Sequence, residues 1–495
     1  MGRLKSFSCF FGIAFAVILS PWLAHLALCP PDQVPTGYFI GWEDYWTFIT
    51  KIDWGSLGNW TYTNQMTPEA VGPVPIYLFY LLLGHISKWT GLSVMWVFHL
   101  ARSAVGAAFL WMWWSFCRRH TEHYIVTAII GLFASFGFLS LLPIASAEYL
   151  ELAVQAHAAV AGLLGFTHYL FDGMAFLLLL EAYLSGEHIE VRSLAAGAML
   201  GMVHPFLLPL IPGVLIVHSA IRREFKAAIK ISFWAAIGSL PFVVPMFSAY
   251  LAEPWLKTWR EQTAISFLWW ETLILVSLTF GLAGIVAWAN LPRALKGNCL
   301  QQISAVWLVL AALLVFFAPL PNSREYGFFL SIPVSIIAAP VIVRFSERVN
   351  TMKVNLVLIS LIIFCCAHGA RSTLDVWAPN EFTYVSKEMI AGLEWLKSKP
   401  KGIVACSADV GLMVPHFTGH RPWVAHTSET IDSRVKNEQM RRMFKAGKLI
   451  PADYAFLTKK FDKKAPELPW KPAYENPEIK IWKLSKGADY EQSKN

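Results

Sequence analysis

A series of long apolar stretches constrains the fold more than any other feature of this sequence. Stretches long enough to cross the hydrocarbon core of a bilayer as helices, about 17–25 residues each, lie at 7–29, 94–116, 124–144, 165–184, 228–248, 268–290, 303–319, 328–344 and 353–369. A further stretch, 193–219, is longer and is interrupted by His204-Pro205. Because proline disfavours continuation of a helix, we expect two shorter helices that meet at His204. The sequence therefore predicts a polytopic α-helical membrane protein with about eleven transmembrane helices.

One short segment, 73–86, decides on which side of the membrane every loop lies. It is too short for a span and suits a helix that lies on the membrane surface. With this segment kept outside, the cytoplasmic segments carry 14 Lys and Arg, and the outer loops before residue 370 carry 5. A spanning 73–86 would place Arg118-Arg119 and the basic cluster at 222–230 outside, against the positive-inside tendency. We therefore predict a cytoplasmic N-terminus.

The last part of the chain, residues 370–495, differs from the rest in composition. It carries 21 basic and 15 acidic residues, and helix-like pieces alternate in it with strand-like pieces. These pieces are Ser386–Lys397, Gly402–Ala405, Arg434–Ala446 and Ile479–Lys483. Such alternation is typical of an α/β domain. We predict a membrane module at 1–369, with a first outer loop at 30–93, and a small C-terminal α/β domain at 370–495 on the outer face.

Charge and short motifs exclude several classes of function. The formal net charge is +8, but the basic residues are scattered or mixed with acids, unlike the basic patch of a nucleic-acid-binding protein. There is no GxxxxGK[ST] and no strand–GxGxxG–helix pattern, so we expect no nucleotide site. No HExxH, DxD or Cys/His cluster marks a metal site; a divalent cation as cofactor is left open, and no metal ligands are assigned.

Polar residues within or beside apolar stretches are costly, which makes them the first candidates for function. On the predicted topology they gather near the outer face. They are Glu43, Asp44, Arg102, Glu148, Glu151, His168, Asp172, His204 and Arg324. We expect an outward-facing site built from the first loop, the region 145–172 and the loop 321–326.

The adjacent acids Glu43 and Asp44 are the candidate catalytic residues. Two carboxylates among aromatic residues, near the membrane surface, could supply a general base for an acceptor hydroxyl. The alternative is a solvated loop in which Asp44 is the N-cap of a short helix, Tyr45–Ile52.

Two arginines and two histidines are the candidate substrate ligands, together with Glu148 and Glu151. Arg102 lies about 12 Å inside its helix, where a charge favours a carboxylate or phosphate partner; snorkelling toward the surface is the alternative. Arg324 could hold a phosphate with paired hydrogen bonds, or pair with Glu325. His168 and His204 are either ligands or satisfied packing residues.

Several motifs together resemble a known family. They begin at Gly41-Trp42-Glu43-Asp44 and continue through Asn64-Gln65-Met66-Thr67-Pro68-Glu69, Pro75-Ile76-Tyr77, Leu83-Gly84-His85 and Gly91-Leu92-Ser93 to Arg102; in the tail they are Ala391–Lys397, Phe417–Arg421, Ala425-His426-Thr427 and Thr430. The chain resembles the GT-C superfamily, integral membrane glycosyltransferases that depend on polyprenyl-phosphate sugars, and in particular its uncharacterised bacterial members.

The resemblance implies a function and a location. The chain would transfer a sugar, with inversion, from a polyprenyl-phosphate donor to an extracytoplasmic acceptor (a glycan, lipid or protein) at the bacterial inner membrane. Asp44, with Glu43 as the alternative, matches the position of the family's base, and Arg324 and Arg102 match positions that could hold either the lipid phosphate or the acidic motif. Rival interpretations are a transporter or lipid flippase, which would show paired broken helices, and a non-catalytic scaffold of the same fold.

Overall fold

The computed structural model describes residues 2–134, 158–263, 280–317, 323–348, 354–446, 450–461, 468 and 471–484. The chain forms two compact units. Unit 1 comprises Met1–Pro21, His99–Pro245 and Ala264–Ala378, and unit 2 comprises Trp22–Phe98, Met246–Thr263 and Pro379–Asn495. The first outer loop therefore shares a unit with the tail. The predicted division at residue 370 stays a prediction.

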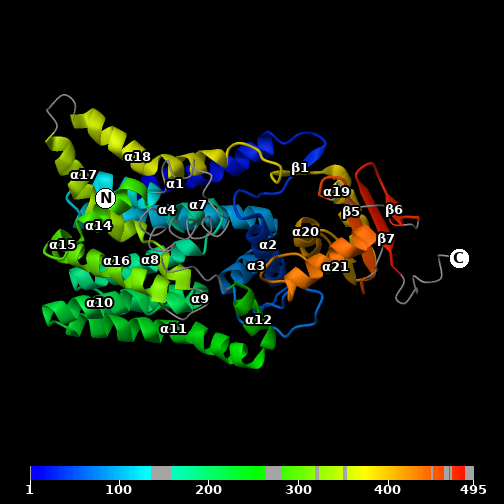
Figure 1. Ribbon diagram of the computed structural model, residues 1–495, viewed down its shortest axis with the longest axis horizontal. Helices are drawn as coiled ribbons and strands as arrows, with labels where there is room; N and C mark the ends of the chain where they lie inside the picture. Colours follow the sequence, from blue (N-terminus) through cyan, green and yellow to red (C-terminus); the bar gives the residue numbers. More distant parts are fainter. Residues whose placement is uncertain are drawn as a thin grey trace. The chain divides into compact units, whose positions relative to one another are not determined.

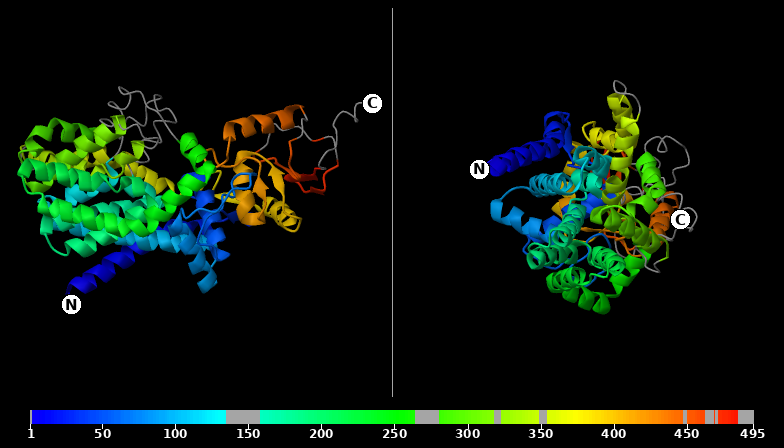
Figure 2. Two further views of the ribbon diagram at one scale, coloured as in Figure 1. Left: turned by 90° about the horizontal axis from the view of Figure 1, so that it is seen from below. Right: turned by 90° about the vertical axis from the view of Figure 1, so that its left-hand side faces the viewer.

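Unit 1 is a bundle of helices, as Figure 1 and the turned views of Figure 2 show. Its helices, some of which continue into unit 2, are α1 (Gly2–Ala27), α4 (Val94–His120), α5 (Tyr124–Phe133), α7 (Ala158–Leu164), α8 (Tyr169–Ser185), α9 (Ile189–Val203), η2 (Pro205–Leu207), α10 (Leu210–Arg222), α11 (Lys226–Ala252), α14 (Gly281–Ala289), α15 (Leu291–Ala294), α16 (Cys299–Phe317), η3 (Ser323–Gly327), α17 (Ser331–Glu347) and α18 (Val354–Asp375). The α17 helix is largely buried and packs against α5, α14, α16 and α18.

Among the described residues, five helical segments are long and apolar enough to cross a membrane. They are Phe7–Ala27, Val94–His120, Pro205–Arg222, Lys226–Ala252 and Glu325–Glu347. Each falls on a stretch that the sequence predicts to span, so the protein is an integral membrane protein. The count of about eleven helices and the side of the membrane that each loop faces stay predictions.

The long apolar stretch 193–219 is divided as the sequence predicts. The α9 helix ends at Val203, and His204 leaves the helical conformation with φ −137° and ψ 73°. A single 3₁₀ turn, Pro205–Leu207, follows, and α10 then begins at Leu210. The prediction of two helices that meet at His204 is confirmed, because Pro205 removes the backbone donor that a continuous helix needs.

Unit 2 contains a five-stranded mixed sheet and the helices around it. Its elements are β1 (Gln33–Pro35), α2 (Trp42–Ser56), α3 (Leu78–Thr90), α12 (Pro254–Thr263), β2 (Tyr384–Ser386), α19 (Lys387–Lys397), β3 (Ile403–Ala405), α20 (Ala408–Thr418), β4 (Arg421–Pro422), α21 (Ser433–Ala446), β5 (Tyr454–Thr458), β6 (Tyr474–Glu475) and β7 (Ile479–Lys483). The strand order is β4-β3-β5-β7-β6, parallel at β4-β3-β5 and antiparallel beyond. The four pieces predicted in the tail are all present at nearly the predicted bounds.

Alternation along the strands places helices on both faces of this sheet. Trp482 of β7 shares a core with Met440 and Met443 of α21. Ile479, an odd number of residues away and so on the other face, packs against Gly392 of α19. The tail is thus a three-layer α/β arrangement, with α21 drawn in orange in Figure 1.

The first outer loop folds into two packed helices, α2 and α3. Gly55 and Gly84 bring the two backbones so close that a Cβ on either would collide with the partner's backbone. The helix predicted at 73–86 begins later, at Leu78, because Val74 forms a β-bridge with Tyr62 and Tyr77 is left-handed. At 13 residues, α3 is shorter than the roughly 20 that a spanning helix needs. A second, two-stranded sheet pairs β1 with β2 and ties this loop to the tail.

Candidate active site

The two candidate catalytic acids open helix α2. Gly41 is its N-cap residue, in the left-handed region at φ 65° and ψ 68°, and no side chain caps the helix. Glu43 and Asp44 lie in the first turn, where the positive end of the helix dipole favours carboxylates. The alternative in which Asp44 caps a helix at Tyr45–Ile52 is therefore wrong. Both carboxylates are nearly half exposed, at 46% and 45% of the side chain, so a substrate can reach them.

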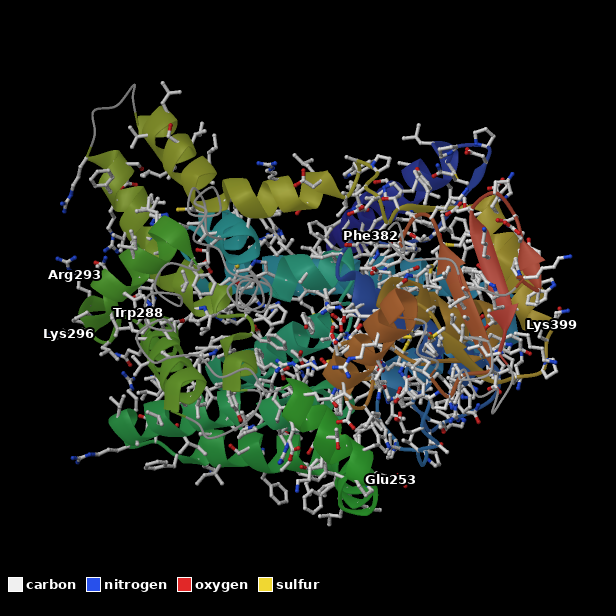
Figure 3. The ribbon with its side chains drawn as sticks, turned by 45° about the vertical axis from the view of Figure 1, so that its right-hand side comes forward. Glu253, Trp288, Arg293, Lys296, Phe382 and Lys399 are labelled. Atoms are coloured by element: carbon white, nitrogen blue, oxygen red, sulfur yellow. The ribbon has the colours of Figure 1, made fainter. Side chains whose placement is uncertain are left out.

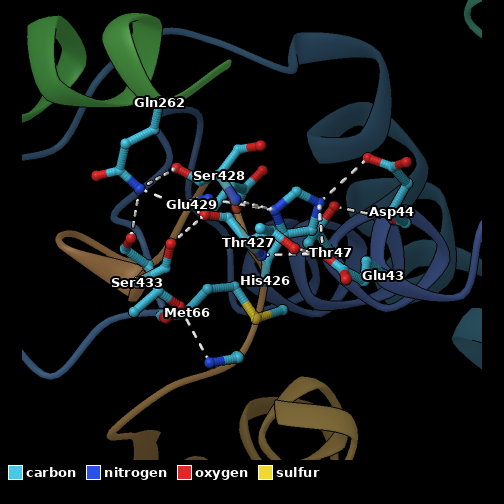
Figure 4. Close-up of polar contacts among 12 residues, drawn as sticks. Glu43, Asp44, Thr47, Met66, Gln262, His426, Thr427, Ser428, Glu429 and Ser433 are labelled. Atoms are coloured by element: carbon cyan, nitrogen blue, oxygen red, sulfur yellow. Dashed lines mark hydrogen bonds and ion pairs between the residues drawn. The ribbon is translucent and has the colours of Figure 1, made fainter. Parts of the chain in front are cut away.

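A segment of the tail, residues 425–433, lies against these acids; we refer to it as the tail loop (Figure 4). Thr427 donates two hydrogen bonds to Glu43 Oε2, one from its backbone N–H at 2.9 Å and one from its hydroxyl. His426 Nε2 lies 3.3 Å from Asp44 Oδ1 and 4.0 Å from Glu43 Oε2. Each acid thus has its own partner in the tail loop.

The tail loop also fixes the ring of His426. Nδ1 accepts the backbone N–H groups of Ser428 at 3.0 Å and Glu429 at 3.2 Å. The neutral ring therefore carries its proton on Nε2 and donates it to Asp44. Burial lowers the pKa of His426, but the hydrogen bond and charge of Asp44, with the charges of Glu429 and Glu43, outweigh this and raise the pKa. Protonation of the neutral ring would place a second proton on Nδ1. The ring would then lose Nδ1 as the acceptor of the Ser428 and Glu429 N–H groups.

A buried ion pair lies beneath the acids. Lys51 is fully buried, and its Nζ donates to Glu429 Oε1 of the tail loop at 2.6 Å. The ammonium also lies 3.6 Å from the ring centroid of Tyr77, a cation–π contact. Burial lowers the pKa of Lys51, while Glu429 and Asp44 act in the opposite direction. Such a pair resists separation, because each partner alone would be an uncompensated charge.

Helix α12 holds the tail loop from another side. The amide nitrogen of Gln262 donates to the carbonyl of Thr430 at 2.8 Å, and its oxygen accepts the N–H of Asp432 at 3.1 Å. Within the first outer loop, Asn64 donates to the carbonyl of Glu429 at 2.8 Å, and Thr430 donates to the carbonyl of Met66 at 2.7 Å. The tail loop is therefore positioned by contacts that do not involve the acids.

The predicted histidines lie together in unit 1. His204 Nδ1 lies 2.6 Å from Asp172 Oδ2, and Asp172 is fully buried in α8. The ring of His168 lies 5.1 Å from that of His204, centroid to centroid. Asp172 Oδ1 has no hydrogen-bond partner among the described residues. His168 and His204 thus share one buried, aromatic-lined spot, and their role as substrate ligands stays a prediction.

Arg102 is buried in α4 and ties three helices together. Nη1 donates to the carbonyl of Leu163 at 2.7 Å, and Nη2 donates to the carbonyl of Ile18 at 2.9 Å. Both terminal nitrogens of the guanidinium thus donate to backbone carbonyls rather than to an anion. This geometry favours a helix-bridging role over the predicted phosphate contact, which no observation tests directly.

Of three further predicted residues, only the backbone of Arg324 can be located. Glu148 and Glu151 lie outside the described residues. The backbone of Arg324 lies in the 3₁₀ turn Ser323–Gly327, while its side chain lies outside the description. Their assignment to the site stays a prediction. Among the described residues, no group of three or more His, Cys, Asp and Glu side chains could hold a metal ion, and we assign no metal ligands.

The sequence analysis did not identify the tail-loop residues as part of the site. His426 and Thr427 belong to a motif that carries the resemblance, but nothing in the sequence pairs them with α2. Lys51 had a detectable signal: it follows Asp44 by two helical turns and so lies on the same face of α2. A buried lysine on that face calls for an acidic partner.

Comparison with known proteins identifies the fold. No protein-family model matches the sequence, and no curated protein sequence matches it. The structure of ArnT from Cupriavidus metallidurans in the apo state aligns with a TM-score of 0.55 at 13% identity, over 97% of this chain and 98% of that one. The apo oligosaccharyltransferase of Archaeoglobus fulgidus aligns with a TM-score of 0.54 at 10% identity, over 91% of this chain and 70% of that one. The chain has the GT-C fold. The same Archaeoglobus protein in complex with zinc and sulfate gives a TM-score of 0.50 at 12% identity, over 90% of this chain and 68% of that one.

The GT-C fold is the fold that the resemblance drawn from the first loop and the tail implies. The ArnT alignment covers nearly the whole of both chains, so it includes the membrane bundle and the tail alike. At these identities the likeness concerns the fold. What the chain does must therefore be argued from its own site.

Proposed function

We propose that this protein is a GT-C glycosyltransferase that moves a sugar from a polyprenyl-phosphate donor to an acceptor outside the cytoplasm, with inversion at the anomeric carbon. The observation that carries the proposal is the pair of half-exposed acids in the first turn of α2, held by the tail loop. The GT-C fold and the absence of a nucleotide motif in the sequence support a lipid-linked donor. The acceptor is a glycan, a lipid or a protein, and the host membrane is the inner membrane of a bacterium.

The chemistry needs a base on one face of the sugar and a cation near the leaving group. A carboxylate of the acid pair takes the proton of the acceptor hydroxyl. The acceptor oxygen bonds to the anomeric carbon through an oxocarbenium-like transition state. The bond from that carbon to the phosphate oxygen breaks, and its electron pair leaves with the lipid phosphate. A cation that stabilises this departing charge lowers the barrier.

We assign the phosphate to Arg324 rather than to Arg102. Arg324 is the only basic residue of its short predicted outer loop, and a guanidinium can hold a phosphate with two parallel hydrogen bonds. Both terminal nitrogens of Arg102 already donate to backbone carbonyls. His168, His204, Glu148 and Glu151 remain candidate ligands for the sugar or the acceptor.

The test is transfer by the full-length protein purified in lipid nanodiscs. A panel of polyprenyl-phosphate monosaccharides is supplied with a crude acceptor extract, and release of polyprenyl phosphate is measured. We expect wild-type protein to release it, and Asp44→Asn to lower the rate by about 10²–10⁴-fold, the usual contribution of a general base. Thermal unfolding of the variant controls for the fold.

Other outcomes separate the rival interpretations. A flippase would move the lipid across the bilayer of a proteoliposome without cleaving it, and a scaffold would do neither. Full activity of the double variant Glu43→Gln/Asp44→Asn would overturn the assignment of the acids to catalysis.

A further inference from the structure

The adjacent acids Glu43 and Asp44 have unequal surroundings. Glu43 Oε2 receives two hydrogen bonds from Thr427, one of them from the backbone. Asp44 receives one hydrogen bond, from His426 Nε2 to its Oδ1 at 3.3 Å. Its second oxygen, Oδ2, has no hydrogen-bond partner among the described residues. Two hydrogen bonds thus tie Glu43 to the backbone and side chain of Thr427, whereas Asp44 has a single donor in the described part of the chain, the imidazole ring of His426.

The donor to Asp44 is held in place independently of Asp44. The backbone N–H groups of Ser428 and Glu429 orient the ring of His426 through Nδ1. The loop that carries this ring is fixed by Gln262 from α12 and by the buried pair of Lys51 with Glu429. His426 is itself only 8% exposed, so water competes little for its Nε2–H. The ring is thus a preorganised donor aimed at one oxygen of Asp44.

We propose that Asp44 is the general base, that His426 is its positioning residue, and that Glu43 anchors the acids to the tail loop through Thr427. The proposal rests on the proposed sugar transfer and assigns different roles within the same site. The Nε2–H···Oδ1 hydrogen bond fixes the rotation of the Asp44 carboxylate and leaves Oδ2 to take the acceptor proton. His426 exchanges no proton in this scheme, so it acts only through Asp44. The tail then supplies a functional part of the site.

Two substitutions of His426 separate its two hydrogen bonds. In His426→Gln, the amide nitrogen reaches the place of Nε2 and can still donate to Asp44, but nothing accepts the loop N–H groups. In His426→Asn, the amide oxygen reaches the place of Nδ1 and can accept them, but no donor reaches Asp44. A positioning role predicts that Gln keeps activity and Asn loses it. A purely structural role in the tail loop predicts the reverse.

The experiment measures kcat and KM for the donor that the wild-type protein accepts. We expect His426→Asn to lower kcat by about 10²-fold, the usual cost of a misplaced reacting group, with KM nearly unchanged. We expect His426→Gln to stay within about tenfold of the wild type, since it keeps the donor. Unfolding midpoints of both variants are measured in parallel, and there Asn should be the more stable.

The acids provide the matched control. Glu43→Gln keeps an oxygen that accepts from Thr427, and should lose much less activity than Asp44→Asn, which should lower the rate by about 10²–10⁴-fold. Equal loss in His426→Gln and His426→Asn, the reverse order, or equal loss in Glu43→Gln and Asp44→Asn would overturn the assignment while leaving sugar transfer established. An inactive wild-type protein across the whole donor panel would instead overturn the proposed function.

Discussion

At the scale of single residues, the sequence identifies the acids but not what holds them. Glu43 and Asp44 stand out because two adjacent carboxylates follow the first apolar stretch among aromatic residues. Their partner His426 is 382 residues away along the chain, and no local pattern connects the two. Contacts of this kind depend on how the tail folds onto the first loop, which periodicity and spacing do not contain. The acid–histidine geometry could therefore come only from the structure.

The pair of Lys51 and Glu429 should be the most sensitive contact between α2 and the tail loop. Both side chains are buried, at 0% and 6% exposure, so removal of one leaves a buried charge without a partner. We expect Lys51→Met to destabilise the protein by about 3–5 kcal/mol. Unfolding of the purified protein, followed by tryptophan fluorescence, measures this effect.

Two further variants test the reason for that loss. Removing both charges in Lys51→Met/Glu429→Leu should restore much of the stability, since no unpaired charge remains. Arg442→Met breaks an exposed pair with Glu438 in α21 and should leave the unfolding midpoint unchanged. A double variant that is less stable than Lys51→Met would show that the ion pair itself, rather than the buried charge, is what matters.

At the scale of helices and strands, the sequence predicts most elements because their signals are local. The break at His204 follows from Pro205, and helix α19 begins directly after Ser386, which caps it by accepting the N–H of Met389. The start of α3 could not be predicted, because the β-bridge between Val74 and Tyr62 holds residues 72–77 out of the helix. A bridge to a distant residue overrides local helix preference at that point.

Helices α9 and α11 provide a test of packing within the bundle. A Cβ at Gly197 would collide with the backbone carbonyl of Ala235, and one at Gly201 would lie 3.0 Å from the Cα of Ser239. Small residues at four-residue spacing on both helices allow this close approach. We expect Gly197→Ala to destabilise the protein by about 1–3 kcal/mol through overpacking.

The same substitution elsewhere in the bundle is the control for that prediction. Gly213 lies in α10, and an added Cβ would meet only Leu310 Cδ2, at 3.6 Å, an ordinary contact. Gly213→Ala should leave stability unchanged or raise it slightly, because alanine favours the helix. Equal unfolding midpoints for the two variants would contradict the close packing of α9 on α11.

At the scale of the whole molecule, the sequence predicts the membrane bundle and the α/β tail, but it does not predict which segments of the chain fold together into one unit. Apolar length identifies the membrane bundle, and alternating pieces identify the α/β tail. The grouping of the first loop with the tail in one unit depends on pairings such as β1 with β2, whose residues are hundreds of positions apart. Pairing between segments so far apart in the chain closes a very long loop, and no local sequence pattern predicts it.

The side of the membrane on which each loop lies can be tested directly. Counting charges places the loop 291–302 in the cytoplasm and the tail outside. Two exposed lysines report on these sides: Lys296, next to Arg293 and Trp288 in unit 1 (Figure 3), and Lys397 at the end of α19. Each is replaced by cysteine in a chain whose seven native cysteines are changed to serine or alanine. In intact spheroplasts, a membrane-impermeant maleimide should label Lys397→Cys, and should label Lys296→Cys only after permeabilisation. The opposite pattern would place the tail in the cytoplasm, together with Asp44 and its partners, and would exclude a donor presented at the outer face.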